Sequence, residues 1–311
     1  MTRVAKTLQS QNTVSSNFST VAEVQRAMLA KLKDSDLNAK DAARLHLEPF
    51  TAQQVAAKLP DLTFKRAGFR IPYFTLQGKQ NCFYRFRYLE YDNGKGFGKL
   101  VHQNGNGAPH KHDVRYVQPS DKPPQLYLPP TVPWAKIAKD VSVPLVITEG
   151  ELKAACGCKH DIPTIGLGGV WSFKSAKEGM HLLPLFAEFQ WGERTVYICY
   201  DSDASSNPSV CAAENALARE LTKLGALVFI CRLPALEGAK TGLDDYIAAR
   251  GAEEFKTAIQ QQAAQYAACE ELFRLNGEVV YVRDPGCIVE LETRNRMTPR
   301  AFVEHAYSNR I

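Results

Sequence analysis

The chain has 311 residues, 45% of them hydrophobic and 23% charged, a composition that is ordinary for a globular protein with an apolar core. It contains no run of 18 apolar residues and its first 18 residues are polar, so we expect neither a membrane span nor secretion and predict a cytoplasmic protein. The net charge of +5 is uneven, because residues 1–140 hold 21 Lys and Arg against 11 Asp and Glu, whereas residues 141–311 hold 17 against 22. This asymmetry favours a first half that binds a polyanion and a second half that collects cations, with unevenly divided surface charge as the plain alternative.

The first 140 residues divide into three predicted segments. Residues 1–18 are polar without periodicity, which predicts a disordered tail. Residues 19–60 hold three helical patterns, each behind residues that can cap a helix, and form a predicted helical lead-in. Residues 61–140 carry alternating aromatic segments between Gly turns and end in a proline-rich connector, which predicts a basic, mainly antiparallel α+β domain. The candidate caps are Ser19 and Thr20, Asp36 or Asn38, and Thr51.

From residue 141 onward, strand-like and helix-like segments alternate. This alternation predicts an α/β domain over residues 141–251, with a parallel sheet flanked by helices. Residues 252–311 are predicted as a helix plus a β-hairpin. The predicted strands lie at 143–148, 163–166, 194–200 and 226–232, and the helices at 150–159, 176–189, 208–224 and around 242–247.

The first strand of the α/β region ends in an acidic motif. Glu149 closes the strand, Gly150 permits a tight turn with close backbone approach, and Lys153 lies one helical turn further on. Both charged side chains can then serve one phosphate-bearing site. The plain alternative is a helix start that carries an acid because negative charge suits the helix dipole.

A second acidic motif, Asp201-x-Asp203, follows the third strand of this region. A turn capped by Asp is one alternative, and a phosphatase-type nucleophile, which normally follows the first strand of its domain, is another. Because the carboxyl ends of parallel strands meet at one edge of a sheet, we expect Glu149, Asp201 and Asp203 to converge. Hard cations prefer oxygen ligands, so the sequence predicts a site for Mg²⁺ or Mn²⁺.

The order of these motifs resembles the TOPRIM domain, which DnaG-type primases, type IA and type II topoisomerases and some nucleases share. Glu-Gly follows the first strand, a Gly-rich turn follows the second, and Asp-x-Asp follows the third, within Val141–Gly251. The resemblance implies catalytic and metal-binding roles for three carboxylates, and turn positions for three glycines. These residues are Glu149, Asp201 and Asp203, and Gly150, Gly168 and Gly169.

Further segments look like those of phage and plasmid primases. They include Gly242-Leu-Asp-Asp-Tyr after the last strand, and Phe69-Arg-Ile-Pro-Tyr and Tyr84-Arg-Phe-Arg in the basic domain. The stretch Gly277–Tyr307 is similar to the segment that precedes the helicase domain of phage primase-helicases. The chain therefore resembles a TOPRIM primase of the DnaG-like, phage type, or the N-terminal primase part of a primase-helicase.

This resemblance implies synthesis of short primers on a single-stranded DNA template from nucleoside triphosphates, in phage or plasmid replication in a bacterial cell. Its implied cofactor is Mg²⁺ or Mn²⁺, and its implied partner is a replicative helicase in the same or a separate chain. Under this hypothesis Asp244 and Asp245 hold a second metal ion, Lys153 acts in catalysis and Lys240 contacts the triphosphate. A TOPRIM nuclease and a non-catalytic single-strand-binding module tethered to a helicase remain alternatives.

Residues 62–115 hold ten Lys or Arg against three Asp or Glu, with aromatic residues between them. Cations neutralise phosphates and aromatic faces stack unpaired bases, so this region is predicted to bind nucleic acid. Strand alternation places Arg85 and Arg87 on a predicted exposed face and the aromatic Tyr84, Phe86 and Tyr88 on a core face, with a solvated strand face as the alternative. The predicted nucleic-acid or nucleotide contacts are Arg66, Arg70, Arg85, Arg87, Lys99, Lys111, Arg115 and Lys240.

The chain departs from the DnaG pattern at two places. None of its eight cysteines forms a Cys-x-x-Cys pair, whereas DnaG primases usually carry an N-terminal zinc finger. Cys156, Cys158 and His160 supply at most three ligands at poor helical spacing, so we expect no zinc and predict buried free thiols. The glycine usual after the Asp pair is replaced by a longer loop over residues 204–208.

Overall fold

The structure is a computed structural model, which describes residues 18–90, 100–101, 110–111, 114–119, 122–202, 207–236, 240–261, 279–282, 287–290 and 296–298. The chain forms two compact units. The first unit comprises Met1–Lys31, His46–Pro72 and Cys82–Lys122, and the second comprises Leu32–Leu45, Tyr73–Asn81 and Pro123–Ile311.

The N-terminal helices begin where the capping residues predict. Asn38 accepts hydrogen bonds from the backbone N–H groups of Lys40 and Asp41, and Thr51 accepts one from Gln54, so both helices that follow start with a capping box. These helices are α1 (Val21–Asp34), α2 (Ala39–Arg44) and α3 (Ala52–Lys58).

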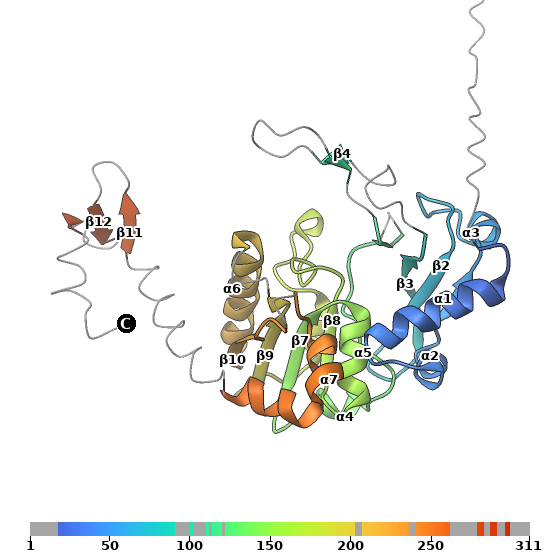
Figure 1. The fold of residues 1–311 in the computed structure, drawn as a ribbon. Coiled ribbons are helices and arrows are strands. Elements are labelled where there is room, and N and C mark those ends of the chain that lie inside the picture. The colour runs from blue at the N-terminus through green and yellow to red at the C-terminus, as the bar shows by residue number, and fades with distance from the viewer. Residues whose placement is uncertain are drawn as a thin grey trace, which may run out of the picture. The chain divides into compact units, whose positions relative to one another are not determined.

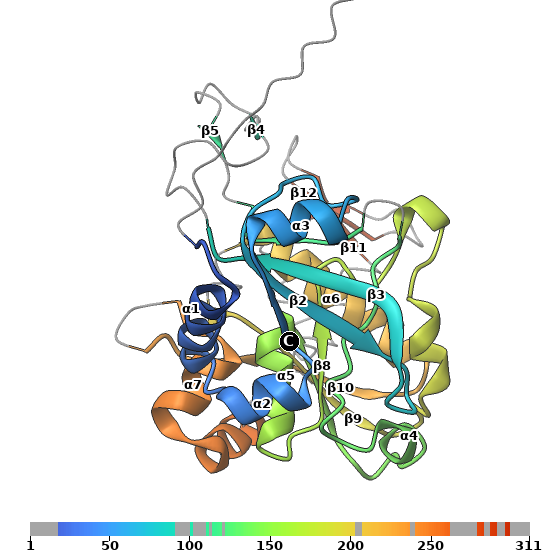
Figure 2. The ribbon, with the colours of Figure 1, turned by 90° about the vertical axis from the view of Figure 1, so that its right-hand side faces the viewer.

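A four-stranded sheet of order β1-β2-β3-β6 follows. Its pairings of β1 with β2 and of β3 with β6 are antiparallel, as the alternating aromatic pattern predicts. β2 and β3 lie side by side, and α3 packs Val55 against Phe86 and Tyr88 of the sheet (Figure 2). The strands are β1 (Glu48–Phe50), β2 (Gly68–Phe74), β3 (Gln80–Tyr88) and β6 (Tyr116–Val117).

The second unit is built on a parallel sheet of order β10-β9-β7-β8 (Figure 1). This confirms the predicted mixed α/β class with a parallel sheet, whereas the strand order was not predicted. The strands are β7 (Leu145–Glu149), β8 (Thr164–Leu167), β9 (Thr195–Tyr200) and β10 (Leu227–Arg232).

Helices cover both faces of this sheet, because its central strands are apolar on both sides. On one face, Ile147 and Ile198 share a core cluster with Leu217 of α6. On the other, Cys199 shares a cluster with Cys156 of α5, and the helical residues 252–261 contribute to it. The helices are α4 (Trp134–Ile137), α5 (Glu151–Lys159), α6 (Pro208–Lys223) and α7 (Leu243–Arg250).

The predicted helix over residues 176–189 is wrong. Two short 3-10 helices, η1 (Ala176–Glu178) and η2 (Pro184–Glu188), stand in its place. Gly179 adopts a left-handed φ of +67° and ends the first, and Pro184 opens the second. A left-handed residue and a proline cannot both lie inside one continuous α-helix.

Arg194, immediately before β9, is fully buried. Its guanidinium donates hydrogen bonds to the backbone carbonyls of Gln190, Ile137, Ala138 and Val143, at 2.8 to 3.3 Å. The side chain therefore ties the α4 segment to the start of β9 at the end of the sheet away from Asp201.

Smaller elements complete the described residues. The C-terminal hairpin is confirmed, because β11 (Val279–Val282) pairs antiparallel with β12 (Cys287–Glu290). None of the described helices has the length and apolar character to cross a membrane. The remaining strands are β4 (Leu100–Val101), β5 (His110–Lys111) and β13 (Arg296–Met297).

Candidate functional site: an acidic sheet edge lined by lysines

Two predicted carboxylates lie at the same edge of the parallel sheet. Glu149 is the last residue of β7, and Asp201 follows directly on β9. The two strands are parallel neighbours, with Ile147 aligned to Ile198, so both carboxyl ends open on one side. Asp201 is 9% exposed and Glu149 is half-buried, and the Glu149 charge helps to raise the pKa of Tyr200 after the larger effect of burial. Asp203 lies outside the described residues.

Asp201 is held between two lysine side chains. The Lys153 ammonium, one turn into α5, forms an ion pair with Asp201 Oδ1. The Lys240 ammonium lies 3.1 Å from Asp201 Oδ2. The sequence predicts that Lys153 reaches a phosphate, whereas in the structure its partner is the Asp201 carboxylate. Two positive charges thus line the acidic edge, which suits a ligand that carries both metal and phosphate.

The turn before α7 also borders the acidic edge. Ser202 and Thr241 exchange hydrogen bonds, since Ser202 N donates to Thr241 O and Thr241 N donates to Ser202 Oγ, both at 2.9 Å. A Cβ at Gly242 would lie 2.7 Å from Lys153 Cε and 3.1 Å from Asp201 Oδ1. A side chain at Gly242 would therefore have to displace the ends of these charged side chains.

The two acids of the Gly-x-Asp-Asp segment have different surroundings. Asp245 Oδ2 accepts a 2.8 Å hydrogen bond from the Gly242 N–H, so this carboxylate caps α7. Asp244 is 6% exposed, and its Oδ1 has no hydrogen-bond partner among the described residues. Burial raises the pKa of Asp244 above 3.8, against the opposing effects of a Ser35 hydrogen bond and the Lys153 charge. A buried carboxylate oxygen that lacks a partner is the kind of group that a bound cation satisfies.

We expect Asp244→Asn to raise the thermal stability of the ligand-free protein near neutral pH. The pKa of Asp244 is higher in the folded protein than in the unfolded chain. Its carboxyl therefore contributes its full stabilisation below the unfolded-state pKa, and this contribution is lost as the pH rises through the folded-state pKa. Asparagine does not titrate, so the advantage of the variant should grow from about pH 3 to about pH 7. Thermal unfolding across this range, with Asp161→Asn at an exposed turn as control, measures it.

The same variant should lose stabilisation by Mg²⁺, because a ligand stabilises the state that binds it. A melting temperature that rises with Mg²⁺ equally in the wild type and in Asp244→Asn would contradict a metal-binding role for Asp244.

The predicted turn glycines lie where β7 and β8 leave the sheet. Gly150 has a φ of +107°, and its N–H donates a 2.8 Å hydrogen bond to Leu167 O. Gly169 O accepts a hydrogen bond from Ser172 N at 2.8 Å, and Gly168 precedes it in the same turn. A positive φ at Gly150 lets the chain turn directly from the strand into α5.

The structure corrects the predicted exposure of the arginines on β3. Arg87 is only 4% exposed, and Arg85 is half-buried. Both guanidinium groups lie over the ring of Tyr116 in β6, at 4.9 Å for Arg85 and 5.0 Å for Arg87. The alternation pattern identified the shared face correctly but could not foresee that the Tyr116 ring of the neighbouring strand packs against both guanidinium groups.

The other predicted cationic residues fall into three groups. One terminal nitrogen of Arg70 donates to both carboxylate oxygens of Glu48, each at 2.8 Å, so Arg70 is held by an ion pair. Arg66 is half-buried and Arg115 is exposed beside β6. Lys111 belongs to β5 but its side chain is not described, and Lys99 lies outside the described residues.

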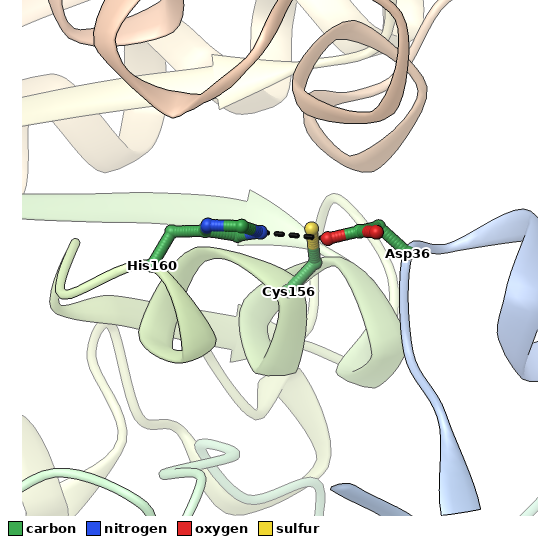
Figure 3. A group of neighbouring side chains, drawn as sticks. All are labelled: Asp36, Cys156 and His160. Atoms are coloured by element: carbon green, nitrogen blue, oxygen red, sulfur yellow. Dashed lines mark hydrogen bonds and ion pairs between the residues drawn. The ribbon is translucent and has the colours of Figure 1, made fainter.

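Sequence reasoning considered Cys156 and His160 together but missed that Asp36 joins them at the far end of α5. Cys156 and His160 lie one turn apart, and Asp36 from the preceding loop completes a group whose ligand atoms lie within 4.8 Å of one another (Figure 3). His160 Nε2 lies 2.6 Å from Asp36 Oδ2. The Lys159 ammonium is 3.0 Å from the same oxygen, so the Asp36 carboxylate is already paired with a positive charge. We interpret the cluster as a set of polar contacts that joins the end of α5 to the loop that carries Asp36. Cys158 points elsewhere, toward Thr164.

Two residues beside the acidic edge also escaped prediction. Glu151, the first residue of α5, is fully buried, and its Oε1 accepts a 2.7 Å hydrogen bond from the Tyr73 hydroxyl. Trp171, in the loop after β8, is 37% exposed. The motif pattern gave no signal for either residue, because neither belongs to the spacing that defines the acidic motifs.

Comparison with known proteins shows which folds this chain resembles. A family model described as a domain of unknown function, DUF3854, matches residues 133–254. No curated protein matches the chain. A DnaG primase catalytic domain bound to single-stranded DNA is similar at 16% identity and a TM-score of 0.52, over 84% of this chain and 80% of that one.

Two further primase structures are similar. The RNA polymerase domain of Mycobacterium tuberculosis DnaG matches at 12% identity and a TM-score of 0.50, over 82% of this chain and 81% of that one. The Aquifex aeolicus primase fragment with zinc-binding and RNA polymerase domains matches at 15% identity and a TM-score of 0.46, over 75% of this chain, which spans 55% of that fragment. The two matches with TM-scores of 0.52 and 0.50 show that the fold of the chain is similar to that of DnaG primase catalytic domains.

Proposed function

We propose that this chain is a metal-dependent DNA primase of the phage or plasmid type, which joins nucleotides into short primers on single-stranded DNA. The observation that carries the proposal is the acidic edge itself. Asp201 lies beside Glu149 at the carboxyl ends of neighbouring parallel strands, with Lys153 and Lys240 on its two oxygens. An edge that presents carboxylates and lysines together suits metal-bound phosphates.

The carboxylates present have the oxygen chemistry that a hard divalent cation prefers, although in the described residues three of their oxygens do not lie within 4.8 Å of one another. Glu149, Asp201 and Asp244 supply carboxylate oxygens, and the unpartnered Asp244 Oδ1 is buried where a cation would satisfy it. Asp203 is proposed as a further ligand on the sequence pattern. Asp245 is excluded from the proposed ligand set, because its Oδ2 caps α7.

Bound Mg²⁺ or Mn²⁺ would activate the primer 3′-oxygen and stabilise the charge that develops on the departing pyrophosphate. The remaining work falls to the chain's own residues. Lys153 and Lys240 hold two positive charges beside Asp201, where they can bind the triphosphate of the incoming nucleotide. Gly242 packs closely against Lys153, because a Cβ at this position would lie 2.7 Å from Lys153 Cε.

In the first unit, we propose that Arg66, Arg85 and Arg115 contact the template backbone. Arg85 is half-buried under Tyr116 and Arg115 is exposed, so both retain access to solvent. Arg87 and Arg70 are assigned structural roles, because one is buried and the other is held by Glu48. A replicative helicase, in the same or a separate chain, is the proposed partner.

The direct test is a template-dependent assay with labelled nucleotides, run beside a nuclease assay on the same single-stranded DNA in Mg²⁺ and in Mn²⁺. We expect labelled products of defined short lengths that need both template and metal. Cleavage of the labelled strand without synthesis would identify a nuclease. Binding without either reaction would identify a single-strand-binding module.

A further inference from the structure

Trp171 differs from the other tryptophans of the chain. It is 37% exposed, whereas Trp134 and Trp191 are 1% and 5% exposed. Among the large hydrophobic side chains that are exposed in the described part of the chain, it is the sole aromatic one. A tryptophan side chain that stays exposed on a folded protein is a candidate for contact with a ligand.

The loop that carries Trp171 is attached to the acidic edge. Val170 O accepts a 3.2 Å hydrogen bond from the hydroxyl of Tyr200, and Tyr200 is the residue directly before Asp201. The Trp171 indole N–H donates to Ser209 Oγ in the first turn of α6 at 3.3 Å. The backbone next to Trp171 is thus bonded to the Tyr200 side chain at the end of β9, and the Trp171 ring itself is bonded to α6, the helix that follows the second acidic motif.

The Trp171 ring is held in one orientation. It lies 6.0 Å from the buried ring of Phe173 at an interplanar angle of 31°. The Lys174 ammonium lies 4.3 Å from the Trp171 ring centroid, in a cation–π contact. A ring fixed by a hydrogen bond, an aromatic neighbour and a cation loses little further freedom when it binds a flat ligand, which favours affinity.

We propose that Trp171 is a stacking platform for an unpaired nucleobase at the acidic edge, and that Lys174 binds the phosphate attached to that base. Every base has an aromatic face, so stacking on an indole tolerates all sequences, and the adjacent ammonium adds phosphate attraction. The proposal rests on the proposed function only in its choice of nucleic acid as ligand. The base belongs either to the template strand or to the incoming nucleotide, and the test separates these two sources.

The test uses the intrinsic fluorescence of the full chain, because two of its three tryptophans are buried. Titration with oligothymidylate, and separately with nucleoside triphosphates, is expected to quench the emission of Trp171. Trp171→Leu should abolish the quenching and weaken binding of the ligand by roughly tenfold. Trp171→Phe should retain most of the affinity, since its ring can still stack.

Two further variants sharpen the result. Leu227→Ala removes another exposed hydrophobic side chain at the opposite end of the sheet and should bind as the wild type does. Lys174→Gln should reduce the slope of log affinity against log salt for single-stranded DNA by about 0.7, as expected for one lost phosphate contact. Thermal unfolding of each variant shows whether the fold is retained.

Quenching by the oligonucleotide alone assigns the template base, and quenching by nucleotides alone assigns the incoming base. Equal affinities of the wild type and Trp171→Leu for both ligands would overturn the proposal. Primer synthesis by a wild type whose affinity does not depend on Trp171 would leave the primase assignment standing without the platform. Conversely, Trp171-dependent binding without synthesis would support the platform and count against the primase.

Discussion

Asp201→Asn is expected to reduce template-dependent primer synthesis by at least about a hundredfold, a loss of roughly 3 kcal/mol of transition-state stabilisation. Asparagine keeps the shape of the side chain but removes the negative charge that a divalent cation needs. It also leaves Lys153 and Lys240 beside a neutral group, which weakens the arrangement of charges at the edge. Initial rates of labelled-nucleotide incorporation at saturating Mg²⁺ measure the effect.

Loss of activity through unfolding must be separated from loss of the metal site. Asp161→Asn makes the same chemical change at an exposed turn and should leave the rate unchanged. The ion pairs of Asp201 are partly exposed, so Asp201→Asn should cost the fold only about 1 kcal/mol or less. Synthesis at half the wild-type rate or more by a folded Asp201→Asn protein would refute the proposed role of this carboxylate.

Arg194→Lys is expected to destabilise the protein by roughly 3 kcal/mol, because a lysine ammonium cannot reach four separate carbonyls in the positions that the guanidinium fork serves. The carbonyls of Ile137 and Ala138 keep backbone donors from Asp140 and Gln190, so the cost comes from the lost guanidinium hydrogen bonds, including those to Gln190 O and Val143 O. For a unit of this size the melting temperature should fall by roughly 10 °C. Chemical denaturation and thermal unfolding measure both quantities.

Arg219→Lys is the matched control, because Arg219 is an exposed residue of α6. Arg194 lies at the opposite end of β9 from Asp201, so the activity per folded molecule of Arg194→Lys should match that of the wild type at low temperature. A destabilisation below about 0.5 kcal/mol would show that the carbonyls find other partners or water.

The acidic edge could be predicted from sequence because it depends on local order. Apolar strands ending in Glu149 and Asp201 are each readable within a few residues, and parallel pairing puts such ends at one edge of the sheet, where the two meet because β7 and β9 are neighbours. The caps at Asn38 and Thr51 were equally readable, because a capping box is contained in four residues.

The errors have a common cause, since each depends on contacts between residues distant in sequence. The burial of Arg87 depends on Tyr116, nearly thirty positions later in the chain. The ion pair of Lys153 with Asp201, and the meeting of Asp36 with His160, likewise join separate elements. The helix predicted over residues 176–189 is the exception, because Gly179 and Pro184 were local signals that should have broken it.

One glycine of α5 limits what a mutational survey of this protein can reveal. A Cβ at Gly157 would lie 2.1 Å from Thr164 Oγ1 of β8, so α5 rests on the sheet at a depth that excludes every other residue type. The same helix carries Lys153, about one turn nearer the acidic edge. Any side chain at Gly157 would lift the helix and shift Lys153 with it. Loss of activity on substitution of Gly157 would therefore reflect how closely α5 packs on the sheet. A ranking of residues by lost activity would wrongly place Gly157 among the residues that touch substrate.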